Sequence, residues 1–366
     1  MSVPPGLPQL SMHESPRRAQ LVLLGFALCL APAWLQAQAP ASDSSPVPPL
    51  FRSETPLAIT LKVNMKQLRD DRGQESPYRP ATISYTGPDG KAVSVPLRVK
   101  THGIWRLKHC DFPPLRLNIA NKQAKGTLFH DLQKPKLINV CRNSERSEQN
   151  VLQEMQLYRI YQVLTPKSHR VRTLRISYED SASGKVEATR YAFLIEDPDE
   201  LADRLGGKMH KVKGAVSGDL EPELASLVYV FQYFIANTDF SFNGLHNGEL
   251  VERPDGSPMW PVAYDFDFSG AVNAQYATAD ASLGIKKVRQ RLFRGYCSLR
   301  DDYPAAFARL REKRDAIYAL YHDSVGKLLE PDVVKETLEY FDEFFNDTKT
   351  PQDIEHNVLR ACVGRS

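Results

Sequence analysis

Carboxylate and amide side chains gather in the second half of the chain in a pattern that could bind a metal ion. Asp239 and Asn247 lie in a polar loop after an apolar run, and Asp265 and Asp267 end a short apolar segment. Aromatic residues flank the last two, so their carboxylates are costly to bury unless they are paired or metal-bound. Oxygen ligands alone suit Mg2+ or Mn2+ better than Zn2+. The pattern predicts a hard-cation site; the alternative is that Asp265 and Asp267 only cap a turn.

Basic side chains that could bind an anion flank Gly103. Arg98 and Arg106 lie on either side of it, as an anion-binding loop between two strands requires. A solvated, positively charged edge strand explains the same residues. A second basic stretch, 286–294, has helical spacing. It is either a site for an acidic or phosphorylated substrate or a solvated helix face.

Lys136 lies in an apolar segment, 133–140, that we expect to be a buried strand. A buried lysine needs a carboxylate partner. Glu154, in the helix predicted over 149–164, is the nearest candidate along the sequence. A strand lysine paired with a helix glutamate positions the lysine against the nucleotide in several phosphate-handling sites. The alternative is that Glu154 is an ordinary solvated helix residue.

The elements that must position these groups change along the chain from strands to helices. Alternating or β-rich segments come first, at 57–63, 81–86, 92–100, 114–119, 170–178 and 189–196, with a hairpin turn at 88–90. Helical patterns follow, at 221–235 and from 301 to 345. Strands first and helices later indicate an α+β arrangement of two lobes.

Length and composition are those of a globular protein without an excess of one charge. The 366 residues are 42% hydrophobic and 25% charged, and the formal net charge is +3. A chain of this length suits one large domain or two lobes. The balanced charge gives no reason to expect nucleic acid as a partner.

The N-terminus has the pattern of a targeting segment. Two arginines precede an apolar run, 21–35, that ends at small residues near 37–39. The run contains Pro32 and is shorter than the roughly 20 residues that a membrane span needs. We therefore expect a signal peptide over 1–39 and an exported protein of the periplasm or the extracellular space. We expect no integral membrane span once the signal is removed.

The cysteines that remain after the predicted cleavage are Cys110, Cys141, Cys297 and Cys362. An even number of cysteines in an oxidising compartment favours disulfides, and these allow three connectivities. Pairing Cys110 with Cys141 and Cys297 with Cys362 is favoured, because each bond then stays within one region. Free buried thiols are the alternative.

The order of the segments over 93–276 resembles the CotH-like (spore coat protein H-like) atypical protein kinases, and best their exported bacterial subgroup. The resemblance is carried by LRVKTHGIWR, Lys136 in KPKLINV, Glu154 in NVLQEMQLYRIY, Glu196 in AFLIED, NTDFSFNGLHN and AYDFDFSG. It implies a two-lobed protein-kinase-like fold, with a β-rich N-terminal lobe and a mainly α-helical C-terminal lobe. It also implies ATP and Mg2+ or Mn2+ as cofactors. The chain departs from protein kinases in having neither a G-x-G-x-x-G loop nor an H-R-D-x-x-x-x-N motif.

The same resemblance implies roles in catalysis and metal binding. Asp239 would orient or deprotonate the acceptor hydroxyl, and Asp265 would chelate the metal on the triphosphate. Asn247 would be the second metal ligand, with Asn243 in reserve. Asp267 joins the metal set because it completes an Asp-x-Asp pattern with Asp265.

The resemblance further implies which residues bind the nucleotide. Lys136 would contact the α and β phosphates, and Glu154 would hold the lysine in place. Glu196 would lie beside the adenine, where the chain crosses between the lobes. Arg98 and Arg106 would belong to the cofactor-binding loop of the first lobe.

These expectations divide the chain into a signal peptide (1–39), a disordered linker rich in serine and proline (40–50), an N-lobe with one helix (51–198) and a helical C-lobe with the catalytic and metal loops (199–366). The expected function is that of an exported ATP-dependent atypical kinase that phosphorylates a protein or envelope acceptor. The alternative is a non-catalytic, pseudokinase-like or structural envelope protein. A metal-dependent hydrolase fits less well, because no histidine ligand cluster or nucleophile motif accompanies the aspartates.

Overall fold

The computed structural model of the protein describes residues 46–364. The chain divides into two units, Met1–Ser42 and Asp43–Ser366, and all the described residues belong to the second. The predicted signal peptide, 1–39, and residues 40–45 of the predicted linker lie outside the described residues. The end of that linker overlaps a short 3-10 helix, η1 (Pro49–Arg52), in which Leu50 is buried. Packed structure therefore begins slightly earlier than the sequence indicates.

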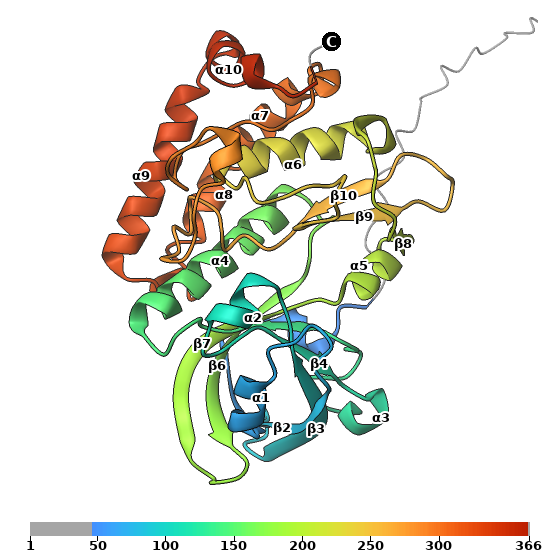
Figure 1. Cartoon of the computed structure of the whole chain (residues 1–366), viewed down its shortest axis with the longest axis vertical. Helices are drawn as coiled ribbons and strands as arrows, with labels where there is room; N and C mark the ends of the chain where they lie inside the picture. The colour runs from blue at the N-terminus through green and yellow to red at the C-terminus, as the bar shows by residue number, and fades with distance from the viewer. Residues whose placement is uncertain (1–45, 365–366) are drawn as a thin grey trace, which may run out of the picture. The chain divides into compact units, whose positions relative to one another are not determined.

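Within residues 46–364, seven strands close into a barrel in the order β1-β2-β3-β4-β5-β7-β6 (Figure 1). Their bounds are β1 Leu57–Val63, β2 Arg79–Thr86, β3 Ala92–Thr101, β4 Leu115–Asn118, β5 Lys136–Ile138, β6 Val171–Asp180 and β7 Val186–Ile195. Neighbouring strands are antiparallel except β1 and β6, whose parallel pairing closes the barrel. The hairpin turn predicted at 88–90 is confirmed between β2 and β3.

Alternation along the strands separates an apolar inside from a polar outside. Ile59 of β1 stands opposite Ile176 of β6, and Leu61 stands opposite Tyr178; all four side chains are buried. Successive side chains of a strand point to opposite faces of the sheet. The outer face is therefore free to carry polar groups, and this freedom is what allows the barrel to position a charged site.

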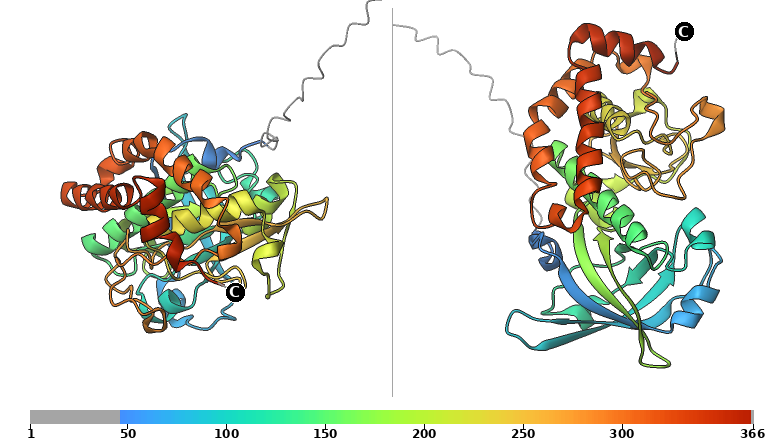
Figure 2. Two further views of the ribbon diagram at one scale, coloured as in Figure 1. Left: turned by 90° about the horizontal axis from the view of Figure 1, so that it is seen from above. Right: turned by 90° about the vertical axis from the view of Figure 1, so that its left-hand side faces the viewer.

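A long helix, α4 (Glu145–Leu164), runs between the barrel and the C-terminal helices (Figure 1). Ser144 begins it, since its hydroxyl accepts a hydrogen bond from the backbone N–H of Ser147 at 3.3 Å. Apolar and polar positions are buried alike, including Gln153 and Gln156. A helix that is buried on all sides belongs to the interior of a fold. In the right-hand view of Figure 2, the barrel lies on one side of α4 and the later helices on the other.

The second half of the chain combines helices with a small sheet. The helices are α5 Pro198–Arg204, α6 Pro222–Phe234, α7 Tyr303–Glu312, α8 Arg314–Ala319, α9 Pro331–Asp347 and α10 Pro351–Asn357. A three-stranded antiparallel sheet joins β8 (Lys208–Met209), β9 (Gly248–Glu252) and β10 (Trp260–Ala263) in the order β10-β9-β8. The shorter helices α1 (Met65–Asp70), α2 (Trp105–His109) and α3 (Asn121–Ala124) accompany the barrel.

The predicted two-lobed protein-kinase-like α+β fold is wrong. The strands of the first half close into a barrel with one parallel pair, where the β-rich N-terminal lobe of a kinase-like fold was expected. Three short helices accompany that barrel besides α4, where one helix was expected, and the second half contains a sheet as well as helices. Pairing β1 with β6 joins segments more than 100 residues apart, and no local pattern encodes such a contact.

Two disulfides confirm the favoured cysteine pairing. Cys110 is bonded to Cys141 and Cys297 to Cys362, with Cα–Cα distances of 4.5 and 5.0 Å. Disulfides persist in oxidising compartments, so both bonds fit an exported protein. Among the described residues, no helix combines the length and the apolar character needed to cross a membrane.

Candidate functional site

A cavity of about 510 Å³ brings most of the predicted site residues together. The barrel side contributes His102, Arg106 and Lys136; the segments after α6 and β10 contribute Asp239, Asn247, Asp265 and Asp267. A larger cavity of about 730 Å³, lined by α7 and α10, contains none of the predicted residues. The candidate site is therefore the smaller cavity, where cationic and acidic groups face each other.

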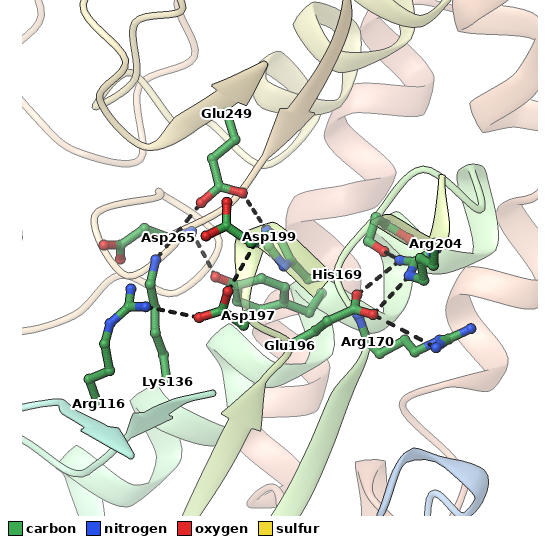
Figure 3. A network of polar contacts seen from close by, with 12 residues as sticks. Arg116, Lys136, His169, Arg170, Glu196, Asp197, Asp199, Arg204, Glu249 and Asp265 are labelled. Atoms are coloured by element: carbon green, nitrogen blue, oxygen red, sulfur yellow. Dashed lines mark hydrogen bonds and ion pairs between the residues drawn. The ribbon is translucent and has the colours of Figure 1, made fainter. Parts of the chain in front are cut away.

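Lys136 is held by a glutamate that the sequence did not indicate. Its Nζ lies 3.9 Å from Oε1 of Glu249 on β9 and 4.2 Å from the ring centre of Tyr264. The other oxygen of Glu249 is 2.8 Å from Nε2 of His169 (Figure 3). Burial lowers the pKa of Lys136, and Glu249 opposes that effect. Burial acts to raise the pKa of Glu249, but His169 and Lys136 hold it below its usual value.

Glu154 pairs with Arg106 and not with Lys136, so the predicted lysine–glutamate pair is replaced by two others. Arg106 Nη1 lies 3.5 Å from Glu154 and 3.8 Å from Asp267, and all three side chains are buried. Burial raises the pKa of Glu154 and the charge of Asp267 adds to the rise, while Arg106 opposes both. The buried guanidinium thus compensates two carboxyl groups at once.

Asp265 and Asp267 follow β10, which pairs with β9, the strand that begins after Asn247 and carries Glu249. Asp265 has φ 61°, and its backbone N–H donates to the Tyr158 hydroxyl at 2.8 Å. Such a conformation is uncommon outside glycine, and asparagine and aspartate tolerate it best. Asp267 accepts a hydrogen bond from Tyr276 at 2.9 Å. Burial raises the pKa of Asp267, and the charge of Asp265 raises it further.

Asp239 lies in the loop that links α6 to β9. Its carboxylate is 2.8 Å from Nε2 of His246 and accepts a hydrogen bond from Nδ2 of Asn247 at 3.1 Å. The hydrogen bond to Asp239 raises the pKa of His246. Asn243 instead donates to the carbonyl of Ala215 at 3.1 Å. Of the two candidate asparagines, Asn247 is therefore the one that meets Asp239.

Gly248 leaves room for the ring of Phe242 where the chain turns from Asn247 into β9. A Cβ atom there would lie 2.8 Å from the ring of Phe242. With glycine in place, Asn247 lines the cavity and Glu249, two residues later, reaches Lys136.

Three predicted site residues do not line the cavity: Glu154, which is buried behind Arg106, Glu196 and Arg98. Glu196 is buried and pairs with Arg204 at 2.8 Å and with Arg170 at 3.8 Å (Figure 3). Its neighbour Ile195 reaches the cavity, because side chains alternate along β7. Arg98 is exposed on β3, 5.5 Å from the ring centre of Tyr78.

The basic stretch 286–294 is irregular in structure and not helical. Two of its arginines turn inward. Arg294 donates to the carbonyls of Thr238 and Phe240, on either side of Asp239. Arg291 lies 3.7 Å from the ring centre of Tyr340 and donates to the carbonyl of that residue. Arg294 thus supports the Asp239 loop, and Arg291 ties the basic stretch to α9.

The carboxylate and amide oxygens of the site suit a hard cation that a bound substrate would also coordinate. In residues 46–364, no group of three or more His, Cys, Asp or Glu side chains is placed to hold a metal alone. Mg2+ is commonly bound by one or two carboxylates plus water and substrate phosphates. Asp239 and Asp265 line one cavity, and the amide nitrogen of Asn247 donates to Asp239, which leaves its oxygen as a ligand.

No protein-family model matches the chain, and no curated protein matches its sequence. The resemblance to CotH-like kinases therefore stays a prediction. Any function must be inferred from the cavity and its side chains.

Proposed function

We propose that the cavity binds ATP with Mg2+ or Mn2+ and transfers the γ-phosphoryl group to a hydroxyl of a protein or envelope acceptor. The observation that supports it is the division of charge across one cavity. Lys136 and Arg106 come from the barrel side, and Asp239, Asn247 and Asp265 come from the opposite side. Phosphoryl transfer needs this division, because catalysis lies mostly in positioning and in neutralising charge. The proposal depends on these side chains and does not require a kinase fold.

Each residue would contribute a separate part of the reaction. Lys136 would contact the phosphate chain, with Glu249 keeping the ammonium charged and in place. Asp239 would accept the proton of the acceptor hydroxyl as its oxygen bonds to the γ-phosphorus and the bond from that phosphorus to the β-phosphate oxygen breaks, leaving ADP. A divalent ion held by Asp265 and Asn247 would neutralise the phosphate oxygens.

The non-catalytic alternative explains only part of the arrangement. Arg106, Glu154 and Asp267 are buried and compensate one another, as a purely structural cluster would. Such a role leaves open why Lys136 and Asp265 line a cavity of about 510 Å³. The charged cavity therefore favours the enzyme.

Transfer of labelled γ-phosphate to the protein itself or to an envelope extract tests the proposal. The parent should transfer label only with Mg2+ or Mn2+. Asp239→Asn should lower turnover by about 100-fold or more while sparing nucleotide affinity, as expected for loss of a general base. The absence of transfer from the parent with either metal, across acceptor extracts, would favour the non-catalytic protein.

A further inference from the structure

Three basic residues stand directly opposite one another across three neighbouring strands. Lys100 of β3 pairs with Arg116 of β4, and Arg116 pairs with Lys136 of β5. Directly opposed residues lie on one face of a sheet, and like charges in such positions destabilise it. The face is the outer one, because the alternate residues Leu115 and Leu137 are buried in the barrel. We call Lys100, Arg116 and Lys136 the cationic row.

Carboxylates compensate part of the cationic row. Arg116 lies 3.0 Å from Asp197, and Lys136 lies 3.9 Å from Glu249. Lys100 lies 5.3 Å from the ring centre of Tyr78. The row thus carries three cations against these two acids. Lys136 lines the cavity, and Arg116 and Lys100 follow it on the two neighbouring strands, outside the lining.

The positive charges of the cationic row act on a side chain that lines the cavity. His102 lies two residues after Lys100 and lines the same cavity as Lys136. Burial, together with the charges of Lys136, Arg116 and Lys100, lowers the pKa of His102 to about 3. A neutral imidazole remains beside the cations and can donate or accept a hydrogen bond without adding charge.

We propose that the cationic row binds the phosphate chain of the nucleotide directly, without a metal ion, with Lys100 as a phosphate-binding residue in addition to Lys136. This inference takes its ligand from the proposed function. Phosphate oxygens would supply the negative charge that the like-charged strand pairs lack. Metal-assisted contacts would then be confined to the opposite wall, at Asp265 and Asn247.

Calorimetric titration with tripolyphosphate in excess EDTA tests the cationic row. The parent should bind, and Lys100→Ala should weaken binding by about tenfold, the loss expected for one charged hydrogen bond. Lys100→Arg should bind nearly as the parent does. Lys91→Ala is the matched control, because Lys91 precedes the other end of β3 and contacts exposed Asp89. A parent that does not bind, or a folded Lys100→Ala protein that binds as the parent does, overturns the proposal.

A second variant should bind tripolyphosphate more tightly than the parent. Partial unfolding would weaken binding, so it cannot produce this result. Asp197→Asn removes the carboxylate that competes for Arg116, so tripolyphosphate should bind at least about threefold more tightly. The fold should survive, because Asp197 accepts from the backbone N–H of Asp199 at 3.0 Å and asparagine keeps that cap. Unchanged or weaker binding by Asp197→Asn contradicts the proposal.

The two proposals fail in different ways. If the protein binds tripolyphosphate in EDTA but its affinity for ATP does not rise with Mg2+, phosphate binding by the cationic row is supported and the proposed function is contradicted. If ATP binding depends on Mg2+ and Asp265 but not on Lys100, the proposed function is supported and phosphate binding by the cationic row is contradicted.

Discussion

Lys136 shows at the scale of one residue what a local pattern can predict. Its strand and its burial are both confirmed, since apolar neighbours on a short segment indicate a buried strand. Its partner Glu249 was missed because it lies more than 100 residues later in the sequence and reaches the lysine only through the packing of β9. Glu154 was the nearest carboxylate along the chain, but α4 presents it to Arg106.

Glu249→Gln tests the pair at this scale. The substitution keeps the shape of the side chain and removes the charge that opposes the effect of burial on Lys136. The ammonium would then lose its proton more readily, and ATP affinity should fall by about tenfold. Glu252→Gln, at the exposed end of β9, is the control and should bind as the parent does. Equal ATP affinity in folded Glu249→Gln and in the parent, measured by calorimetry, would contradict the assigned role.

At the scale of elements, several helices, a hairpin and the loops that carry Asp239 and Asp265 were predictable, but the conformation of the basic stretch 286–294 was not. The periodicity of α4 and α6 and the turn between β2 and β3 all follow from local signals. The stretch 286–294 has helical spacing yet forms no helix, because Arg291 and Arg294 turn toward backbone carbonyls instead of facing solvent. Tertiary contacts of this kind override local propensity.

Arg294 is expected to hold the Asp239 loop in position. Arg294→Gln removes the donors to the carbonyls on both sides of Asp239. Turnover should fall by about tenfold or more while ATP affinity stays within about twofold, because only the orientation of Asp239 is lost. Arg289→Gln is the matched control from the same stretch, since that guanidinium lies 4.3 Å from the ring centre of Tyr340. A parallel loss of affinity and turnover would instead indicate general disruption.

At the scale of the whole molecule, the barrel is what the sequence could not reveal. Each strand was largely recognisable, but the parallel register of β1 with β6 depends on contacts between distant segments. The disulfides were more predictable, because few pairings are available to so few cysteines. Cys110 and Cys141 flank the segment that carries β4 and β5, and so link α2 to the strand of Lys136.

Removing the first disulfide should destabilise the whole molecule. The bond closes a loop over a sequence separation of 31 residues. In the chain-entropy model, such a loop contributes roughly 3 to 4 kcal/mol to the free energy of unfolding. The double variant Cys110→Ala, Cys141→Ala should lose about that amount in urea unfolding, and non-reducing mass mapping of the parent should recover the Cys110–Cys141 peptide. Free thiols at both positions would contradict the pairing.

Acid should destabilise the protein partly through His102. Its pKa of about 3 in the folded state lies below the ordinary value of 6.5, so the unfolded chain binds a proton that the folded one does not. Stability is therefore fully present above pH 6.5 and is lost as the pH falls toward 3. His102→Gln should lessen this loss, by at most about 1.4 kcal/mol per pH unit. Urea unfolding at pH 7 and pH 5 measures it; equal losses in variant and parent would exclude His102.

The central claim is that the charged cavity is a metal-assisted nucleotide site, and ATP binding with and without Mg2+ or Mn2+ tests it most directly. The purified parent should bind ATP at least about tenfold more tightly with metal, since a hard cation links the carboxylates to the phosphates. Asp265→Asn, which suits the φ of 61° at that position, should bind ATP equally with and without metal. Asp255→Asn, in an exposed turn, should behave as the parent. No metal-dependent gain in the parent, or the full gain in Asp265→Asn, would contradict the claim.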